Sequence, residues 1–373
     1  MFSKSEMNDF KKYDPRIDLI RFLAFFLVFF THFVNKGGNA ISLSTNQWWD
    51  SFLIQQFADF GGQGVPLFFI LTGFLLGRLL IREFSLKGTI SLKSFMLRRI
   101  LRIWPLYFLF FVICLTANNF APNTPAINSS EIPYYLTFTY NWGQILSGIP
   151  GSMATITWSV SVEEQIYLLL PILLLVTRNP SFKLVTVIFV LAGAISHLLS
   201  DFGYISSIGR QTSAYLLPVG VGIFMAMHEQ FFRNKLISHF SFTALAIFYC
   251  ITYPISYGYI DDMAFTSLIR SLLTCFFFIT LLHLCDKYIR RTSLPIRLIA
   301  RFGRISYGCY LYHWAIWTVM VSRGIFFTTQ GGFSVLGVFV GLITTLVMSE
   351  ISYRYFEYWF LTKRKRFQMV ESP

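Results

Sequence analysis

The chain has 373 residues, of which 54% are hydrophobic and only 13% are charged. Soluble domains carry about 25% charged residues, and a mean hydropathy of +0.56 also excludes an ordinary soluble globular protein. The net charge of +13 would suit a nucleic-acid-binding protein, but the placement of the basic residues supports a different explanation.

Apolar runs recur along the whole chain at about the length, roughly 20 residues, that a helix needs to cross a bilayer. The first run follows several lysines, as in a signal peptide, but it contains Arg21 and His32 and no small-residue cleavage site follows it. It is therefore predicted to be a retained span. The sequence predicts an all-α polytopic transmembrane bundle of about ten spans, near residues 17–34, 60–80, 100–117, 156–177, 184–199, 212–227, 239–257, 265–285, 305–322 and 334–356.

The basic residues are distributed unevenly over this predicted topology. If the N-terminus is cytoplasmic, the cytoplasmic segments and adjoining span ends hold all but four of the 31 lysines and arginines. The positive-inside rule then places both termini in the cytoplasm. The positive charge is thus explained by topology, and no nucleic-acid partner is predicted. The connection 118–155 contains no Lys or Arg and is predicted to be an ordered external loop or a short interfacial helix.

The five cysteines lie in or beside apolar segments, and none has C-x-x-C spacing. The sequence therefore predicts neither a disulfide framework nor a metal site.

Ionisable residues inside a bilayer are costly, so each is a functional candidate unless it is paired structurally. In the first span Arg21 and His32 are eleven residues apart, which is ~1100° of helix, so both project from one face about 16 Å apart along the axis. Arg21 is predicted near the cytoplasmic end and His32 toward the outer leaflet. The alternative makes Arg21 a snorkelling topological residue and His32 a hydrogen-bonded core residue.

The second and third spans add a hydroxyl and a group of arginines. Thr72 and Gly73 lie near mid-membrane, where a small residue permits close helix packing and the threonine could line a cavity. Arg99 and Arg102 form an i,i+3 pair at the cytoplasmic boundary, with Arg98 beside them. Guanidinium groups match phosphate geometry, so these arginines are predicted to bind a nucleotide-type donor; lipid headgroup contact or a purely topological role is the alternative.

The fourth span carries two adjacent carboxylates, Glu163 and Glu164, in its outer half. By helix rise they lie about 18–20 Å above the inner boundary, and His32 lies about 21 Å above it. A carboxylate beside a histidine raises its basicity and fixes its tautomer, which suits general-base chemistry. One glutamate is predicted to face His32, and the other could bond Trp158, Tyr167 or an arginine. The alternative is a structural ion pair, for example with Arg270.

The ninth predicted span begins FGRISYGCYLYHWAIW, which places His313 near mid-membrane among aromatic residues that include Tyr307. Both side chains are candidates for lining a cavity. The alternative is a packed histidine capped by a tyrosine.

Five of these stretches together resemble the acyltransferase 3 family of integral membrane acyltransferases. They are DLIRFLAFFLVFFTHF, FFILTG with Thr72 in place of a serine, RRILRIWPLY, TWSVSVEEQIYLLLP and ISYGCYLYHW. They follow the family's order from about residue 14 to about residue 360, and the threonine keeps the hydroxyl group. Residues 1–373 are therefore predicted to form a single acyltransferase 3 membrane domain.

The resemblance implies transfer of an acyl group, usually acetyl, from cytoplasmic acyl-CoA to a hydroxyl of a glycan or another acceptor. O-antigen (lipopolysaccharide), capsule, another exopolysaccharide, a lipid-linked sugar and a small secondary metabolite are all candidate acceptors, and a bacterial surface glycan is favoured. In family terms His32 is the central catalytic residue, Arg21 is essential nearby, and Arg99 and Arg102 belong to a donor-side motif. Acetyl-CoA is a substrate, and no bound cofactor is expected. His32 could act as a base for direct attack or carry the acyl group covalently.

The resemblance also implies a multi-pass protein of the bacterial inner membrane. Some family members carry an additional esterase-like domain of the SGNH type; this chain is expected to lack one, so a hand-off would need a separate periplasmic protein. The main alternative is a transporter that uses the intramembrane Glu and His residues as a proton relay, although no inverted repeat or pair of broken spans stands out. A non-catalytic scaffold is a further alternative.

Overall fold

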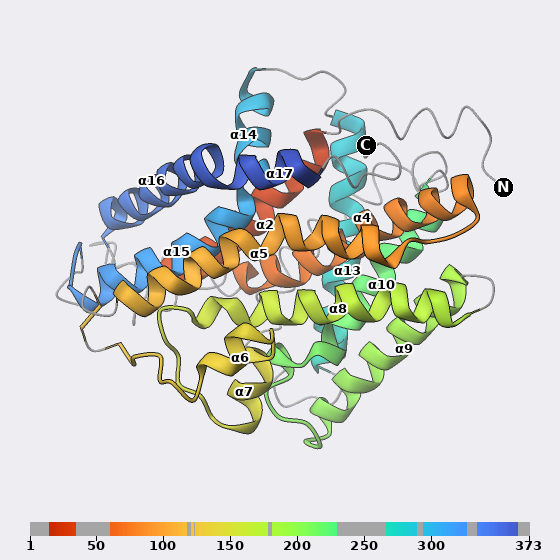
Figure 1. Cartoon of the computed structure of the whole chain (residues 1–373), viewed down its shortest axis with the longest axis horizontal. Helices are drawn as coiled ribbons and strands as arrows, with labels where there is room; N and C mark the ends of the chain where they lie inside the picture. The colour runs from red at the N-terminus through yellow and green to blue at the C-terminus, as the bar shows by residue number, and fades with distance from the viewer. Residues whose placement is uncertain are drawn as a thin grey trace, which may run out of the picture.

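In a computed structural model of the chain, the structure describes residues 15–34, 60–117, 121–122, 124–177, 181–229, 266–288, 294–326 and 334–364. All regular secondary structure within these ranges is helical (Figure 1), as the sequence predicts. Each of the nine predicted apolar segments in these ranges contains a helix. The predicted segment 239–257 lies outside the described residues.

The helices are longer than the apolar segments in several places, because charged residues continue the helix beyond the apolar length. Short 3-10 and π-helical turns (η) join some of them. In chain order the elements are α2 (Pro15–Val34), η1 (Gly61–Gln63), α4 (Gly64–Lys87), α5 (Leu92–Thr116), α6 (Ile132–Leu136), α7 (Tyr140–Leu146), η3 (Thr155–Thr157), α8 (Trp158–Val176), α9 (Phe182–Asp201), η4 (Ile208–Arg210), α10 (Thr212–Met227), α13 (Thr266–Tyr288), α14 (Leu294–Arg304), α15 (Ser306–Ser322), α16 (Val335–Ser352), η5 (Tyr353–Glu357) and α17 (Tyr358–Arg364).

Six helical stretches among the described residues are long and apolar enough to cross a membrane. Helix α10 and the first part of α13 are apolar but shorter, and α15 has 17 residues. These helices agree with a multi-pass membrane protein; the total of ten spans and the cytoplasmic termini stay predictions. The six stretches are Pro15–Val34, Gly61–Lys87, Leu92–Thr116, Thr155–Val176, Phe182–Asp201 and Val335–Lys363.

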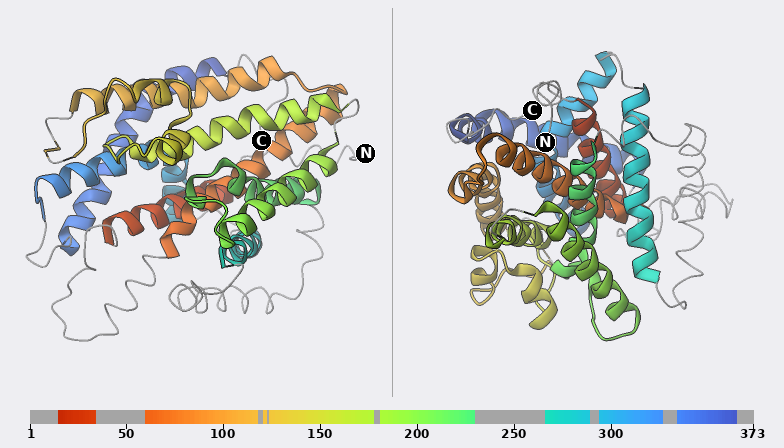
Figure 2. Two further views of the ribbon diagram at one scale, coloured as in Figure 1. Left: turned by 90° about the horizontal axis from the view of Figure 1, so that it is seen from below. Right: turned by 90° about the vertical axis from the view of Figure 1, so that its right-hand side faces the viewer.

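Helix α13 has a different direction from the main bundle. Helices α5 and α8 run along the long axis of the molecule, and α13 stands across them (Figure 1). The end-on view in Figure 2 shows the same crossing, with α13 upright at the edge of the bundle. The described part of the predicted eighth span, residues 266–285, is therefore helical but does not run alongside α5 and α8.

Helices α4 and α10 pack against each other through glycines. A Cβ atom at Gly73 of α4 would collide with the backbone of Val219, and one at Gly222 of α10 would collide with the backbone of Ile70. Small residues at such crossings let two backbones approach closely, which is a common way to associate helices in membranes. The close packing predicted for Gly73 is confirmed.

Helix α2 occupies a central position and packs against α4, α14 and α15. Its residues Phe25, Phe29 and Phe33 recur every four positions and so lie on one face of the helix. All three are at most 1% exposed, and the rings of Phe29 and Phe33 stack with centroids 4.2 Å apart. This aromatic stripe fixes the face on which His32 is presented.

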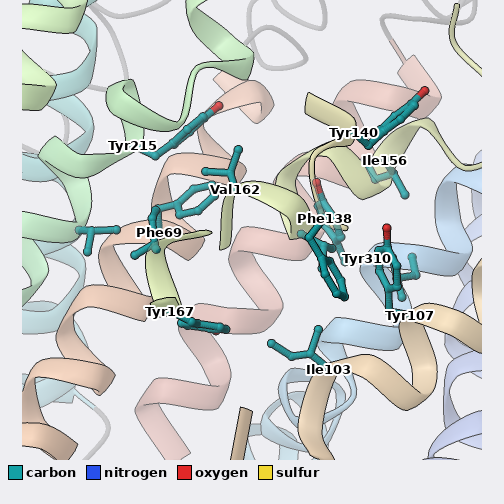
Figure 3. Close-up of a cluster of buried hydrophobic side chains, with 14 of the residues drawn as sticks. Phe69, Ile103, Tyr107, Phe138, Tyr140, Ile156, Val162, Tyr167, Tyr215 and Tyr310 are labelled. Carbon is teal, nitrogen blue, oxygen red and sulfur yellow. The ribbon is translucent and has the colours of Figure 1, made fainter. Parts of the chain in front are cut away.

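The described part of the connection, residues 121–122 and 124–155, contains the short helices α6 and α7; its predicted external location stays a prediction. Tyr107 of α5 donates a hydrogen bond to the carbonyl of Tyr135 (2.9 Å), and the rings of Tyr135 and Tyr140 stack with centroids 4.2 Å apart. Figure 3 shows Tyr107, Phe138 and Tyr140 in the large buried cluster that includes this connection. The connection therefore belongs to the packed core beside the candidate site.

Candidate active site

Two neighbouring cavities contain most of the residues that the sequence singled out. The first, of about 100 Å³, contains the arginines and is called the arginine cavity; its walls come from α2, α4, α5, α8 and α15. The second, of about 440 Å³, contains His32 and is called the histidine cavity. Both cavities are lined by Val65 and Tyr310. Tyr167 lines the first and Tyr215 the second, and both are labelled in Figure 3.

The arginine cavity brings together guanidinium groups from two helices. Arg21 of α2 and both Arg99 and Arg102 of α5 line it, with Glu163 as the acidic residue among the described lining residues. Arg21 forms an ion pair with Asp18 at 2.9 Å, whereas the described residues give Arg99 and Arg102 no ion pair. The Arg99 guanidinium instead lies over the Tyr167 ring, 5.5 Å from its centroid. The cavity thus has an excess of positive charge, which favours an anionic ligand.

Arg98 is separated from this pair, although it is adjacent in sequence. It is 4% exposed and pairs with Glu83 of α4 at 3.0 Å. Successive residues of a helix point about 100° apart, so Arg98 faces α4 while Arg99 faces the cavity. The structure therefore places Arg98 in a buried ion pair that joins α4 to α5, and not in the wall of the arginine cavity.

The two adjacent glutamates have different environments. Glu163 accepts a hydrogen bond from the Thr72 hydroxyl (3.2 Å) and another from the Tyr167 hydroxyl, and both partners line the arginine cavity. Glu164 accepts a hydrogen bond from the indole of Trp104 (3.1 Å). Its other carboxylate oxygen is buried without a hydrogen-bond partner among the described residues.

The prediction that one of these glutamates orients His32 is wrong. In the described part of the chain, neither glutamate forms a hydrogen bond or an ion pair with His32. Helix α2, which carries His32, packs mainly on α4, α14 and α15. Helix rise placed the groups at similar depth, but depth alone does not determine which helices are neighbours. Of the three partners predicted as alternatives for the other glutamate, Tyr167 is observed, bonded to Glu163; the tryptophan that bonds Glu164 is Trp104 and not the predicted Trp158.

His32 pairs instead with His313 of α15. Nδ1 of His32 and Nε2 of His313 are 2.9 Å apart, and the two rings are nearly parallel. Nδ1 of His313 is 3.1 Å from the carbonyl oxygen of Cys309, one turn earlier on the same helix. His313 is fully buried and stacks on His32. It lines neither of the two cavities, so the structure does not place it as the cavity-lining candidate that the sequence predicts.

With both rings neutral, this chain of hydrogen bonds is consistent with one tautomer of each ring. A carbonyl oxygen can only accept, so Nδ1 of His313 donates to Cys309, and Nε2 of the neutral ring is then an acceptor. Nδ1 of His32 must therefore donate to His313, which leaves the lone pair of His32 on Nε2. His32 lines the histidine cavity, so its arrangement matches that of a general base whose tautomer is fixed by a second group.

A tyrosine and a valine separate the two cavities. The Tyr310 hydroxyl is 2.7 Å from the Ser159 hydroxyl, and Ser159 lines the arginine cavity next to Trp158, which lines the histidine cavity. Phe68 packs edge-on against the Tyr310 ring, with centroids 5.9 Å apart. Tyr310 is 6% exposed, so this wall is held by hydrogen bonding and aromatic packing.

Six of the ten predicted site residues line the arginine cavity: Arg21, Thr72, Arg99, Arg102, Glu163 and Tyr307. Among the described residues, no group of three His, Cys, Asp or Glu side chains is placed to hold a metal ion. Sequence reasoning missed the pairing of His32 with His313 and the role of Tyr310 in the shared wall. Two histidines in apolar helices could have suggested the pairing, since each needs a polar partner there.

Comparisons with known proteins were made over the whole chain. A family profile described as an acyltransferase domain matches residues 14–354. The chain is 25% identical over 331 residues to a Staphylococcus aureus (strain COL) protein provisionally named an O-acetyltransferase; the match covers 82% of this chain and 53% of that protein. It is 24% identical over 381 residues to the peptidoglycan O-acetyltransferase OatA of Listeria monocytogenes, covering 93% and 56% of the two chains.

A further relative is the O-acetyltransferase OatA of Staphylococcus aureus (strain NCTC 8325 / PS 47), which is 26% identical over 325 residues, covering 81% of this chain and 53% of the relative. The chain thus spans about half the length of the curated relatives that it matches. No solved structure matches the chain.

Proposed function

The chain belongs to the acyltransferase 3 family, and we propose that it moves an acyl group, acetyl in the simplest case, from acyl-CoA to a hydroxyl of a cell-surface glycan. The observation that carries this proposal is the pair of adjoining cavities. One is cationic and suits an anionic donor, the other presents a histidine in a base tautomer, and the two share a wall. A two-substrate transfer reaction requires such an arrangement, because donor and acceptor must meet at one catalytic group.

Acetyl-CoA fits the chemistry of the arginine cavity. Its phosphates are anionic, and the lining arginines include Arg99 and Arg102, which have no ion pair among the described residues, besides Arg21, which pairs with Asp18. The cavity volume of about 100 Å³ is below the ~300–1,000 Å³ typical of pockets that enclose a whole ligand. Only the thin acyl-bearing arm would therefore enter the cavity, with the phosphates held by the arginines near its mouth.

The proposed topology places the arginine end of α5 at the cytoplasmic face. The positive-inside rule supports this side, since basic residues concentrate in the predicted cytoplasmic segments. Acyl-CoA would then enter from the cytoplasm, with both termini on that side of a bacterial inner membrane and about ten spans in total. His32 would lie deeper, toward the outer leaflet, where a surface glycan is available.

In the proposed reaction Nε2 of His32 accepts the proton of the acceptor hydroxyl. The hydroxyl oxygen attacks the thioester carbonyl, the carbon–sulfur bond breaks, and the CoA sulfur takes the proton back from His32. The products are an acetyl ester and free CoA. His313 orients His32 through the 2.9 Å contact and, through Cys309, keeps the lone pair on Nε2. General-base catalysis of this kind contributes roughly 10²–10⁴-fold to a rate.

The acyl group must pass the wall between the cavities. Tyr310 and Val65 line both, so the thioester would come to lie beside Tyr310, with His32 on the other side. The donor side is lined by Glu163 and its two hydrogen-bond partners, Thr72 and Tyr167. We therefore propose that Glu163 shapes the donor site and does not orient His32.

The acceptor class is proposed from the relatives. They are named O-acetyltransferases, and the Listeria monocytogenes relative is named for peptidoglycan. Peptidoglycan therefore joins O-antigen, capsule, other exopolysaccharides and lipid-linked glycans as a candidate acceptor. These acceptors share sugar hydroxyls, which the histidine cavity could accommodate beside Trp158 and Tyr215.

The test uses the purified full chain in nanodiscs, radiolabelled acetyl-CoA, and surface glycan from cells that lack the chain. We expect CoA release that requires glycan and is accompanied by label on the glycan. We expect both to disappear in His32→Ala. An inactive wild-type chain that nevertheless moves glycan or protons across vesicles would contradict the proposal and favour a transporter. Label trapped on the protein without acceptor, and lost in His32→Ala, would replace direct transfer by an acyl-histidine intermediate.

A further inference from the structure

The histidine cavity contains a second cationic group that the proposed reaction does not use. Arg210, the last residue of η4, lines this cavity together with His32. Arg210 belongs neither to the arginine cavity nor to the group of basic residues in the predicted cytoplasmic segments. It is half-buried. Within the residues that the structure describes, its guanidinium has no carboxylate within ion-pair distance and no hydrogen-bond partner.

The backbone around Arg210 is fixed in place. Its amide donates to the carbonyl of Ser207 (2.8 Å), and its own carbonyl accepts from the side-chain amide of Asn141 in α7 (3.2 Å). The hydroxyl of Tyr215 donates to the carbonyl of Gly209 (2.8 Å). Arg210 is therefore presented to the cavity from a segment that three hydrogen bonds hold, as expected for a preorganised binding group.

The remaining lining residues favour a sugar that carries an acidic group. None of the described residues that line the cavity is acidic, and Trp158 and Tyr215 provide aromatic rings whose centroids are 5.9 Å apart. Aromatic side chains offer flat apolar surfaces with polar edges, against which a sugar ring can lie. The volume of about 440 Å³ falls within the ~300–1,000 Å³ of small-molecule sites.

We infer that the acceptor is anionic: a carboxylate or phosphate of the acceptor binds to Arg210 while its reacting hydroxyl lies beside His32. This inference rests on the proposed function, whose acceptor it narrows to acidic or phosphate-bearing glycans. A guanidinium fork can bind either oxyanion through two parallel hydrogen bonds. The donor phosphates and the acceptor anion then have separate arginine sites, one in each cavity, so the two substrates do not compete for the same charge.

The test measures equilibrium affinities of the full chain in nanodiscs of zwitterionic lipid by titration calorimetry. The probes are trigalacturonate, its methyl ester, and glucose 1-phosphate. The ester keeps the sugar scaffold and removes the negative charge. Wild-type protein is expected to bind at least one charged probe about tenfold or more tightly than the ester, because a charged hydrogen bond contributes roughly 10- to 100-fold. A preference for trigalacturonate indicates a carboxylate acceptor, and one for glucose 1-phosphate indicates a phosphate.

Two variants and a control locate the effect. Arg210→Gln should abolish the preference and leave binding of the ester unchanged, whereas Arg323→Gln, at an exposed arginine outside the cavity wall, should retain it. Gly209→Phe should exclude all three probes without unfolding the chain, because a Cβ at Gly209 meets no atom within 4 Å. Equal affinity of the wild type for charged and neutral probes, no binding of either charged probe, or a preference that survives Arg210→Gln would overturn the inference.

The same protein separates this inference from the proposed function. His32→Ala should retain the preference for the charged probe and lose acyl transfer. A wild-type chain with the Arg210-dependent preference but no transfer would contradict the proposed function and support the anion site. Transfer to glycan with no such preference would support the proposed function and overturn the anion site.

Discussion

The arginine cavity and the histidine cavity differ in how their residues are arranged along the chain. The first takes its charged groups from short motifs in single helices, such as the i,i+3 pair of Arg99 and Arg102. The second is assembled from η1, η3, η4 and five helices, and its base depends on a partner 281 positions away in sequence. A charged entry site can thus be specified by local spacing, whereas an oriented base requires tertiary packing.

The wall between the two cavities relates their difference to the proposed reaction. Tyr310 contributes to both cavities, and its hydroxyl contacts Ser159 on the arginine side. The donor and acceptor sites therefore adjoin at Tyr310 and Val65, which the acyl group must pass to reach His32. Substitutions in the two cavities should have effects of different kinds, and substitutions at the wall should mix them.

Replacing His32 should have the largest effect. His32→Ala removes the proposed base, so kcat for acyl transfer should fall by roughly 10²–10⁴-fold, while affinity for acetyl-CoA stays within about twofold because the donor site is elsewhere. Transfer and donor binding are measured separately, by CoA release and by titration calorimetry. A loss of donor affinity equal to the loss of rate would show that the two cavities are not functionally distinct.

Replacing His313 tests whether it positions the base. His313→Phe leaves Nδ1 of His32 without its acceptor, so kcat should fall roughly 10- to 100-fold, the range for a buried polar group that loses its partner. KM for both substrates should change little. His313→Gln can both donate to the Cys309 carbonyl and accept from His32, so it should recover part of the rate.

The readout for His313 is the pH profile together with the split between kcat and KM. The profile of His313→Phe should differ from that of the wild type, because the tautomer of His32 is no longer fixed. If His313→Phe and His313→Gln have the same activity, and their pH profiles match that of the wild type, His313 is only a packing residue.

Arg102 and its sequence neighbour Arg98 form a matched pair for the donor side. Arg102→Gln should raise the KM for acetyl-CoA about tenfold and leave the melting temperature unchanged, since the described residues give Arg102 no ion pair. Arg98→Gln should lower the free energy of unfolding by about 3–5 kcal/mol, because it leaves Glu83 buried without its partner. Donor kinetics and thermal unfolding distinguish the two; a donor KM raised equally in both would contradict the separation of Arg98 from the cavity.

The smallest expected effects are those at the shared wall. Tyr310→Phe removes only the contact with Ser159 and should cost about 1 kcal/mol of stability and no more than a fewfold change in rate. Tyr310→Ala should join the two cavities and admit water to the thioester. Acetyl-CoA hydrolysis without acceptor should then rise relative to Tyr310→Phe, and CoA release measures it. Equal hydrolysis in both variants would show that Tyr310 does not separate donor from acceptor.

Much of the arrangement could be predicted from the sequence because hydrophobic length and helical spacing are local properties. Apolar runs predict helices, and the eleven-residue spacing from Arg21 to His32 predicts one helix face. Such spacing also predicts that Arg99 and Arg102 act together. It cannot show that Arg98 turns to Glu83 of another helix, because that contact depends on how α4 and α5 pack.

The partner of His32 could not be predicted for the same reason. Depth arguments gave His32 and the two glutamates similar heights, and a carboxylate is a common partner for histidine. His32 contacts His313 and not a carboxylate because α2 packs on α15 and α4. The direction of α13 across the bundle (Figure 2) is likewise a property of the assembled fold and not of its apolar length.

The central claim is that the donor's acyl group reaches His32 from the arginine cavity, past Tyr310. The most direct measurement is a cryo-electron microscopy structure of the full chain in nanodiscs with an acetyl-CoA analogue whose thioester sulfur is replaced by methylene. The account predicts phosphate density against Arg99 and Arg102, with the acetyl end beside Tyr310 and facing His32. An analogue bound elsewhere, with the arginine cavity unchanged, would contradict the account.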